Sequence, residues 1–210
     1  MTFATVLPAA LFGFGTSLAL IVAIGAQNAY VLRVGLQAVT RVVVPVVVVC
    51  AVSDAVLISA GVAGVGALVE AAPQAVVVVQ IVGAGFLLVY GAFAAKRAIR
   101  PVGALTVEAG APPARVVPAV LGALAFTWLN PHTYLDTIVF LGSVANHQPP
   151  ELRWWFAGGA VTGSLVWFSA LGFGARLLRP LFAKPVAWRV LDAVIAVVMV
   201  ALGLRLLFGL

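Results

Sequence analysis

The sequence reads TWLNPHTYLDT from Thr127 to Thr137, within a run from Val116 to Pro150 that is otherwise apolar. This stretch places six polar or ionisable side chains and a proline where a membrane-spanning helix would be expected. Proline lacks a backbone donor and clashes with the preceding helical turn. Asn130 and Pro131 are therefore predicted to break or kink the helix.

His132 and Asp136 follow this predicted break and lie four residues apart. If the helix resumes after Pro131, the two side chains share one face. Ionisable side chains inside hydrocarbon are costly and are usually functional. The alternative is a kinked core helix whose polar groups satisfy one another.

The composition excludes an ordinary soluble domain. Of the 210 residues, 64% are hydrophobic and 9% are charged, whereas about 25% of residues are charged in a soluble domain. The formal charge of +6 could indicate a nucleic-acid partner, but the basic residues lie in short connectors between apolar runs, which is typical of anchoring at the cytoplasmic face of a membrane. The single cysteine excludes an intrachain disulfide and a Cys-based zinc site. No nucleotide-binding, metal-binding or nucleophile-elbow motif is present, so we expect no cofactor, no metal and no catalytic residue.

Six apolar runs are long enough to cross a bilayer, which takes about 20 residues. They cover residues 3–32, 42–69, 71–95, 116–150, 154–175 and 186–210. We therefore predict an all-α integral membrane protein with one transmembrane domain over residues 1–210. A polar, proline-containing linker at 96–115 divides the runs into two groups of three, residues 1–95 and 116–210.

The two groups are predicted to be inverted repeats. Residues 51–57 (AVSDAVL) resemble residues 160–166 (AVTGSLV), and the first and fourth runs are both overlong with a polar break. Because three is an odd number, the second group of three spans has the opposite orientation to the first. Inverted repeats with interrupted helices in corresponding positions are typical of secondary transporters.

Polar groups also interrupt the first two apolar runs. Gly25, Gln27 and Asn28 mark either a local unwinding that exposes backbone groups to a cavity or an ordinary helix end at the interface. Asp54 lies near the middle of the second run, where a lone acid costs about 2.5–3.5 kcal/mol. Because of this cost, we predict that Asp54 and Asp136 face a common polar cavity near the membrane midplane.

Without an ATP-binding motif, transport through such a cavity would be driven by an ion gradient. Carboxylates suit cationic cargo or protons, whereas amides and freed backbone groups suit the ammonium and carboxylate of an amino acid. The predicted binding residues for cargo and protons are Asp54, Asp136, His132, Asn130, Gln27 and Asn28, and the predicted helix breaks are at Gly25 and Pro131. An intramembrane enzyme is the competing class, but no convincing nucleophile accompanies His132 and Asp136.

The charged residues near the ends of the runs predict the orientation of the chain. Ten basic residues lie in the connectors one–two, three–four and five–six, and two, Arg153 and Arg205, lie on the opposite side. Under the positive-inside rule, both termini and the turn at Glu70–Gln74 should face outward. The remaining acid of the sixth run, Asp192, follows Arg189 by three residues, and this spacing predicts a local structural ion pair.

Three motifs resemble the LysE/ArgO family of basic amino-acid exporters. They are GAQNA at Gly25–Ala29, SDAVLI at Ser53–Ile58 and TWLNPHTYLDT at Thr127–Thr137, and the number and spacing of the apolar runs match as well. The resemblance implies export of L-lysine, L-arginine or both across the bacterial inner membrane, by proton antiport and as a homodimer. Two alternatives are an exporter of neutral amino acids or another small metabolite in the same superfamily, and a membrane protein that does not transport.

The mechanism that we expect uses Asp136 or Asp54 as a carrier that holds either a proton or the cationic cargo. A buried negative site cannot cheaply stay empty, but either cation can neutralise it. His132 could relay the proton, or it could be a neutral hydrogen-bond donor that orients Asp136. The sequence leaves both roles open.

Overall fold

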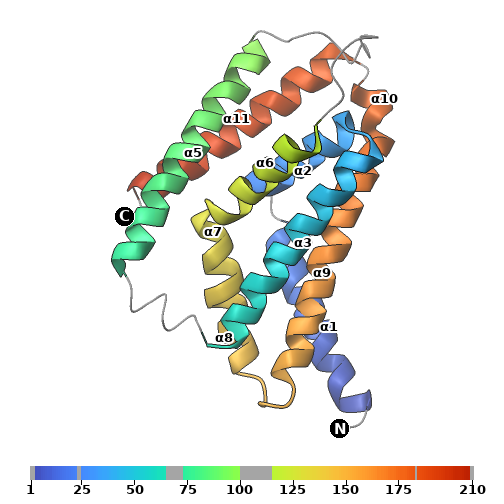
Figure 1. Ribbon diagram of the computed structural model, residues 1–210, viewed down its shortest axis with the longest axis vertical. Coiled ribbons are helices and arrows are strands. Elements are labelled where there is room, and N and C mark those ends of the chain that lie inside the picture. Colours follow the sequence, from blue (N-terminus) through green and yellow to red (C-terminus); the bar gives the residue numbers. More distant parts are fainter. Residues whose placement is uncertain (1–2, 23–24, 65–72, 100–114, 183, 209–210) are drawn as a thin grey trace.

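The computed structural model describes residues 3–22, 25–64, 73–99, 115–182 and 184–208. Over these residues all of the regular secondary structure is helical (Figure 1), as predicted for its fold class. The elements are α1 (Phe3–Ile21), α2 (Ala26–Gln37), α3 (Thr40–Val62), α5 (Pro73–Ile99), α6 (Val116–Trp128), α7 (Pro131–Tyr134), the π-helix η1 (Leu135–Leu141), α8 (Gly142–Asn146), α9 (Arg153–Gly174), the 3-10 helix η2 (Ala175–Leu178), α10 (Arg179–Phe182) and α11 (Pro185–Phe208).

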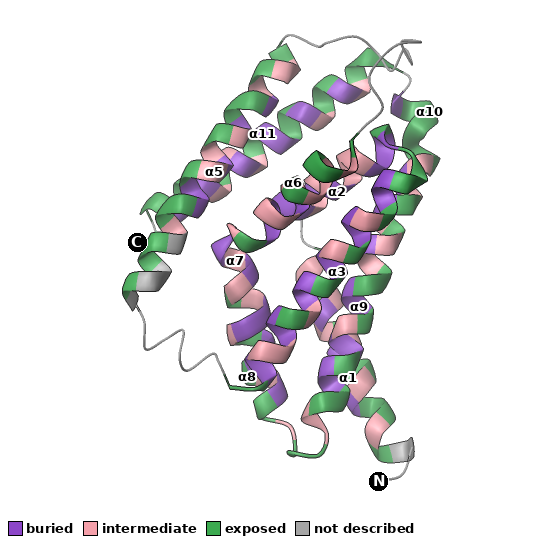
Figure 2. Cartoon of the chain, in the orientation of Figure 1, coloured by how far each residue is buried: buried purple, intermediate pink, exposed green. Residues whose placement is uncertain are grey.

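Among the residues that the structure describes, four helical segments are long and apolar enough to span a bilayer. They are Thr40–Val62, Gln80–Ile99, Arg153–Phe182 and Pro185–Phe208, and the pair α1–α2, bent by 84°, makes a fifth if it is one broken span. α6 has 13 residues, too few to span alone, since about 20 are needed. The outward face of α3 exposes an apolar residue at every fourth position, namely Val44, Val48, Val52 and Val56 (Figure 2). Lipid accommodates such a stripe, and the chain is a multi-pass membrane protein.

Two groups of helices lie on either side of the short, broken ones. α5 packs along α11, while α1 and α3 both pack against α9. In Figure 1 the α5–α11 pair lies at the left and the α1–α3–α9 group at the right, with α6 and α7 between them. The polar breaks predicted from the sequence therefore lie in the middle of the molecule.

α3 and η1 approach closely because glycines lie at their crossing. A Cβ atom on Gly61 would lie 2.6 Å from the carbonyl oxygen of Ile138, and one on Gly142 would lie 2.7 Å from the carbonyl carbon of Gly61. Small residues let the backbones of membrane helices come this near to one another. This contact positions η1, which carries Asp136, against α3, which carries Asp54.

The described helix ends that flank the basic connectors lie at one end of the molecule, the upper end in Figure 1, where α5 ends and α10 lies. Arg176 donates a hydrogen bond to Oγ1 of Thr40, and Arg179 donates one to the carbonyl oxygen of Ala38 at 3.1 Å. The five–six connector is therefore bonded to the one–two connector.

α5 extends past the boundary expected for the linker at 96–115. It continues to Ile99 because Lys and Arg are good helix formers and the first proline of the linker is Pro101. Residues 100–114 of that linker and residues 70–72 of the predicted turn at Glu70–Gln74 lie outside the described residues. Pro73 and Gln74 form the start of α5.

Candidate functional site

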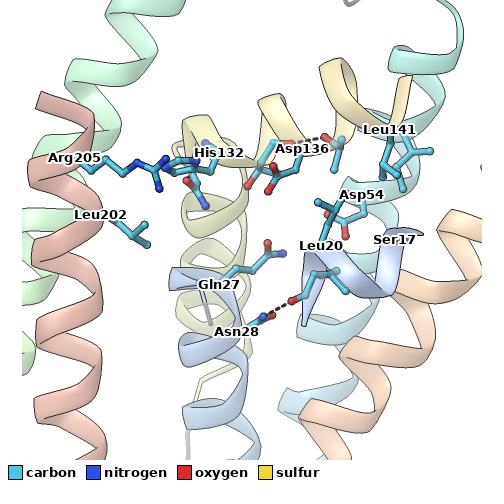
Figure 3. Close-up of a pocket in the computed structure, with 16 residues that line it drawn as sticks. Ser17, Leu20, Gln27, Asn28, Asp54, His132, Asp136, Leu141, Leu202 and Arg205 are labelled. Carbon is cyan, nitrogen blue, oxygen red and sulfur yellow. Dashed lines mark hydrogen bonds between the residues drawn. The ribbon is translucent and has the colours of Figure 1, made fainter. Parts of the chain in front are cut away.

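A cavity of about 220 Å³ with polar and apolar side chains in its wall lies among α1, α2, α3, α11 and the segment around the second break (Figure 3). All six residues predicted to bind cargo or protons line it: Gln27, Asn28, Asp54, Asn130, His132 and Asp136. Gly25 lines it as well. The fold thus brings polar residues from both halves of the chain to one place.

The first break separates α1 from α2. α1 ends at Ile21 and α2 begins at Ala26, with Gly25 in an extended conformation at the N-cap. The end of a helix leaves backbone carbonyls without intrahelical partners. The side-chain amide of Asn28 donates to one of them, the carbonyl oxygen of Ile21, and its Oδ1 accepts from Nε1 of Trp167 at 3.1 Å. Asn28 therefore connects the two parts of the broken helix to each other and to α9.

Gln27 connects the first break to the second. Its Nε2 donates to Oγ1 of Thr127 at 2.9 Å, and Thr127 in turn donates to the carbonyl oxygen of Ala123. Both side chains are buried, and a buried polar group without a partner would cost about 1–3 kcal/mol. The hydrogen bond therefore couples the position of α2 to that of α6.

Asn130 and Pro131 form the second break, between α6 and α7. Asn130 is extended at the N-cap of α7, and its Oδ1 accepts from the backbone N–H of His132 at 3.2 Å. Pro131 takes the first helical position, where its missing N–H would have no intrahelical partner anyway. The Tyr134 hydroxyl donates to the carbonyl oxygen of Trp128, at the end of α6, at 2.6 Å. Asn130 thus caps a helix as well as lining the cavity.

A π-helical segment, η1, carries Asp136 in its first turn. The sequence does not signal this element, which is rare and frequent at functional sites. Asp136 is half-buried and makes no hydrogen bond or ion pair with any residue that the structure describes. Nε2 of His132 is buried and also lacks a hydrogen-bond partner among those residues. The carboxylate and the imidazole are therefore available to a group that enters the cavity.

Asp54 is the more deeply buried of the two cavity acids, with 3% of the residue exposed. Its Oδ2 accepts a hydrogen bond from Oγ of Ser164 on α9 at 2.6 Å. The neighbouring Ser53 accepts one from Nε1 of Trp128 at 3.1 Å. The Ser164 hydroxyl is neutral, so it orients Asp54 but does not compensate a negative charge on it.

α11 contributes cavity residues that the sequence did not indicate. Leu202 and Arg205 line the cavity, and Figure 3 shows the Arg205 side chain extending from α11 toward His132. In the sequence, Arg205 reads as a basic residue near a helix end, an ordinary interfacial position. Leu202 and Arg205 are three residues apart and therefore lie on one face of the helix, but only the packing of α11 shows that this face lines the cavity.

The expected ion pair between Arg189 and Asp192 is wrong. Asp192 is buried and accepts instead from Arg33 on α2 and from Nε of Arg97 on α5, the latter at 3.1 Å. Arg189 is exposed. The spacing along α11 did not predict the partner of Asp192, because the face of α11 that carries Asp192 packs against α2 and α5. These two helices bring arginines from distant parts of the chain. This cluster of Asp192, Arg33 and Arg97 lies outside the cavity lining.

Comparison with known proteins gives consistent results over nearly the whole chain. The sequence pattern of a family described as LysE type translocator matches residues 18–209. A Mycobacterium tuberculosis protein (strain ATCC 25618 / H37Rv) named "Putative amino-acid transporter Rv0488" is 46% identical over 186 residues, which cover 89% of this chain and 90% of that protein. "Lysine exporter LysE" of Corynebacterium diphtheriae is 39% identical over 225 residues, covering 94% and 98%. "Arginine exporter protein ArgO" of Serratia proteamaculans is 39% identical over 194 residues, covering 92% and 93%. No solved structure matches the chain.

Proposed function

The chain belongs to the LysE type translocator family, and from that premise we propose that it exports basic amino acids, L-lysine or L-arginine, across the bacterial inner membrane in exchange for protons. The family resemblance predicted from the three motifs is confirmed, and it makes the chain a transporter rather than an enzyme. The relatives named as lysine and arginine exporters, each 39% identical, support the class of cargo.

The observation that carries this proposal is the pair of acids in one cavity. Asp54 and Asp136 come from different helices and line the same space with three amide side chains, and neither acid forms an ion pair with a described residue. A cavity of this kind attracts a cation, because an uncompensated buried carboxylate is costly. A neutral amino acid would leave one of the two carboxylates without a partner.

We propose that the chain forms six spans in two inverted repeats, residues 1–95 and 116–210, joined by the linker at 96–115. The helix packing supports this arrangement: α3 packs against α9 and α5 against α11, which pairs the second spans with each other and the third spans with each other. The broken first span packs on α9, and the broken fourth span packs on α3. Each break thus lies against the second span of the other repeat, as a two-fold relation requires.

For the orientation, we propose that both termini face outward. The described helix ends that flank the basic connectors lie at one end of the fold, where Arg176 and Arg179 bond to the one–two connector. That end would be cytoplasmic under the positive-inside rule. A reporter that works only outside the cytoplasm should be active when it is fused to either terminus. Activity at one terminus and not at the other would mean an odd number of spans.

The exchange mechanism follows from the charges. Moving a +1 amino acid out of a cell that is negative inside costs about 2.3 kcal/mol per 100 mV. One inward proton per cargo cancels this electrical cost and leaves the pH gradient to drive export. Asp136 or Asp54 would hold the two cations alternately. His132 would either relay the proton or orient the acid, and His132→Gln separates these roles because an amide can donate a hydrogen bond but cannot carry the proton.

The test uses purified protein in proteoliposomes. Vesicles with an acidic lumen should accumulate labelled L-lysine or L-arginine, because protons that leave the lumen drive the cargo inward, and a membrane potential should have little effect on a one-for-one exchange. Vesicles loaded with unlabelled lysine should also show counterflow. Exchange of neutral amino acids without exchange of basic ones would overturn the proposal.

A further inference from the structure

Arg205 is an exposed residue of α11 whose side chain forms part of the cavity wall. Its side chain extends from α11 into the lining (Figure 3), and it makes no hydrogen bond or ion pair with any described residue. The arginines of the Asp192 cluster differ, because Arg33 and Arg97 both bind Asp192. The positive charge of Arg205 therefore remains available to an anionic group in the cavity.

The fixed charges of the lining match the charges of one class of cargo. Among the described residues, the lining holds two carboxylates, Asp54 and Asp136, and one guanidinium, Arg205. A basic α-amino acid carries two cationic groups, the α-ammonium and the side-chain group, and one anion, the α-carboxylate. Each charge of such a cargo therefore has an opposite partner in the cavity, whereas a diamine without a carboxylate would leave Arg205 uncompensated.

We propose that Arg205 binds the α-carboxylate of the cargo and thereby selects basic α-amino acids over the corresponding decarboxylated amines. This inference rests on the proposed export of lysine or arginine. The guanidinium suits the task because it remains charged and offers two parallel N–H donors to a carboxylate. The carboxylates of Asp54 and Asp136 then take the α-ammonium and the side-chain cation of the cargo.

The alternative role for Arg205 is an interfacial anchor, since a long basic side chain near the end of a membrane helix keeps its charge in water. An anchor has no reason to distinguish lysine from 1,5-diaminopentane, which is lysine without its carboxylate. Arginine and its decarboxylated amine, agmatine, form a second pair of this kind. Comparing the members of a pair isolates the interaction between Arg205 and the carboxylate.

The experiment measures how well unlabelled compounds compete with labelled L-lysine in counterflow. In the wild-type protein, L-lysine should compete at least about tenfold better than 1,5-diaminopentane. In Arg205→Gln, competition by L-lysine should weaken by about ten- to a hundredfold, the range expected for a lost charge-assisted hydrogen bond. Competition by the diamine should be kept or improve, because the variant removes a like charge from the cavity, and this competition also shows that the variant is folded. Arg205→Lys should recover part of the preference, because it restores the charge but not the two parallel donors.

Arg189→Gln is the matched control, because Arg189 is exposed near the other end of α11 and does not line the cavity; it should keep the wild-type ratio. If Arg205→Gln weakens lysine and the diamine equally, or changes neither, the carboxylate assignment is wrong. Wild-type protein that exchanges no basic amino acid would instead overturn the proposed function. The two failures are thus distinguishable.

Discussion

Asp192 and Asp136 are both acids within the helical bundle, yet their surroundings are opposite. Asp192 accepts from Arg33 and Arg97, so the protein itself compensates its charge. Asp136 lines the cavity and has no ion-pair partner among the described residues. A carboxylate that already binds two guanidinium groups cannot take a cationic cargo without losing them. The comparison therefore separates an acid that holds helices together from an acid that can carry cargo.

Asp54 resembles Asp136 in having no ion-pair partner among the described residues, although it is as deeply buried as Asp192. Its partner is the hydroxyl of Ser164, which orients the carboxylate without neutralising it. Burial alone thus does not distinguish the two kinds of acid. What distinguishes them is whether a cation of the protein lies within bonding distance.

The largest effect that we expect is a complete loss of net export in Asp136→Asn, and likewise in Asp54→Asn. An amide binds neither a proton nor a cation as a carboxylate does, so the exchange cycle has no carrier. The variants should still fold and insert, because the amide is close in shape to the carboxylate. Lysine uptake driven by an acidic vesicle lumen measures the effect. Wild-type rates in both variants would contradict the assignment of Asp54 and Asp136 as carriers.

Asp192→Asn should act on stability rather than on exchange. Removing the carboxylate leaves two arginines in the cluster without their counter-charge, and breaking a buried ion pair in this way costs about 3–5 kcal/mol. Thermal unfolding in detergent should therefore occur at a lower temperature, while the exchange rate per folded molecule stays within about twofold. Adding Arg97→Gln should recover part of the loss, because it removes one of the two uncompensated cations.

The opposite pattern in Asp192→Asn, full stability with lost exchange, would place Asp192 among the carriers. It would also remove the distinction between compensated and uncompensated acids on which the comparison depends.

The cavity residues could be predicted from the sequence because lipid penalises polar groups strongly. Asp54, Asp136 and the amides are polar residues within apolar runs. Because facing hydrocarbon is costly for them, they are expected to face the protein interior. The all-helical class and the membrane location follow from the same apolar runs. Proline chemistry predicted a break at Asn130 and Pro131, and the structure ends α6 just before them.

What the sequence did not show depends on packing between distant elements. Arg33 and Arg97 lie 159 and 95 residues from Asp192, so the nearer Arg189 was the natural but wrong partner. Arg205 has the sequence surroundings of an ordinary interfacial residue, and only the position of α11 brings it to the cavity. The π-helical turn that carries Asp136 has no local sequence signature of its own.

A smaller effect is expected when Asp54 loses its orienting donor. Ser164→Ala removes the hydrogen bond to Oδ2 of Asp54, and a bond to a charged group contributes about 1.5–3 kcal/mol. Lysine counterflow should therefore slow by about tenfold or more, without being abolished. Thr162→Ala is the matched control on the same helix, because its hydroxyl donates to the carbonyl oxygen of Gly158 on that helix and does not line the cavity; it should exchange at close to the wild-type rate. Equal losses in both variants would indicate a general effect on α9.

The smallest effect concerns the neutral hydrogen bond between the two helix breaks, from Gln27 to Thr127. Gln27→Met and Thr127→Val keep similar volumes but each leaves one buried polar group without this partner, so each should lower the free energy of unfolding by about 1 kcal/mol. The double variant should cost less than the sum of the two, with a coupling of about 1 kcal/mol, because neither unpaired group remains. Thermal unfolding of the three variants gives this coupling.

If Gln27 also binds cargo, Gln27→Met should slow lysine counterflow more than Thr127→Val, although both lose the same bond. Additive costs in stability would show that the two breaks are not coupled through this pair, and the cavity would then depend on its charged residues alone.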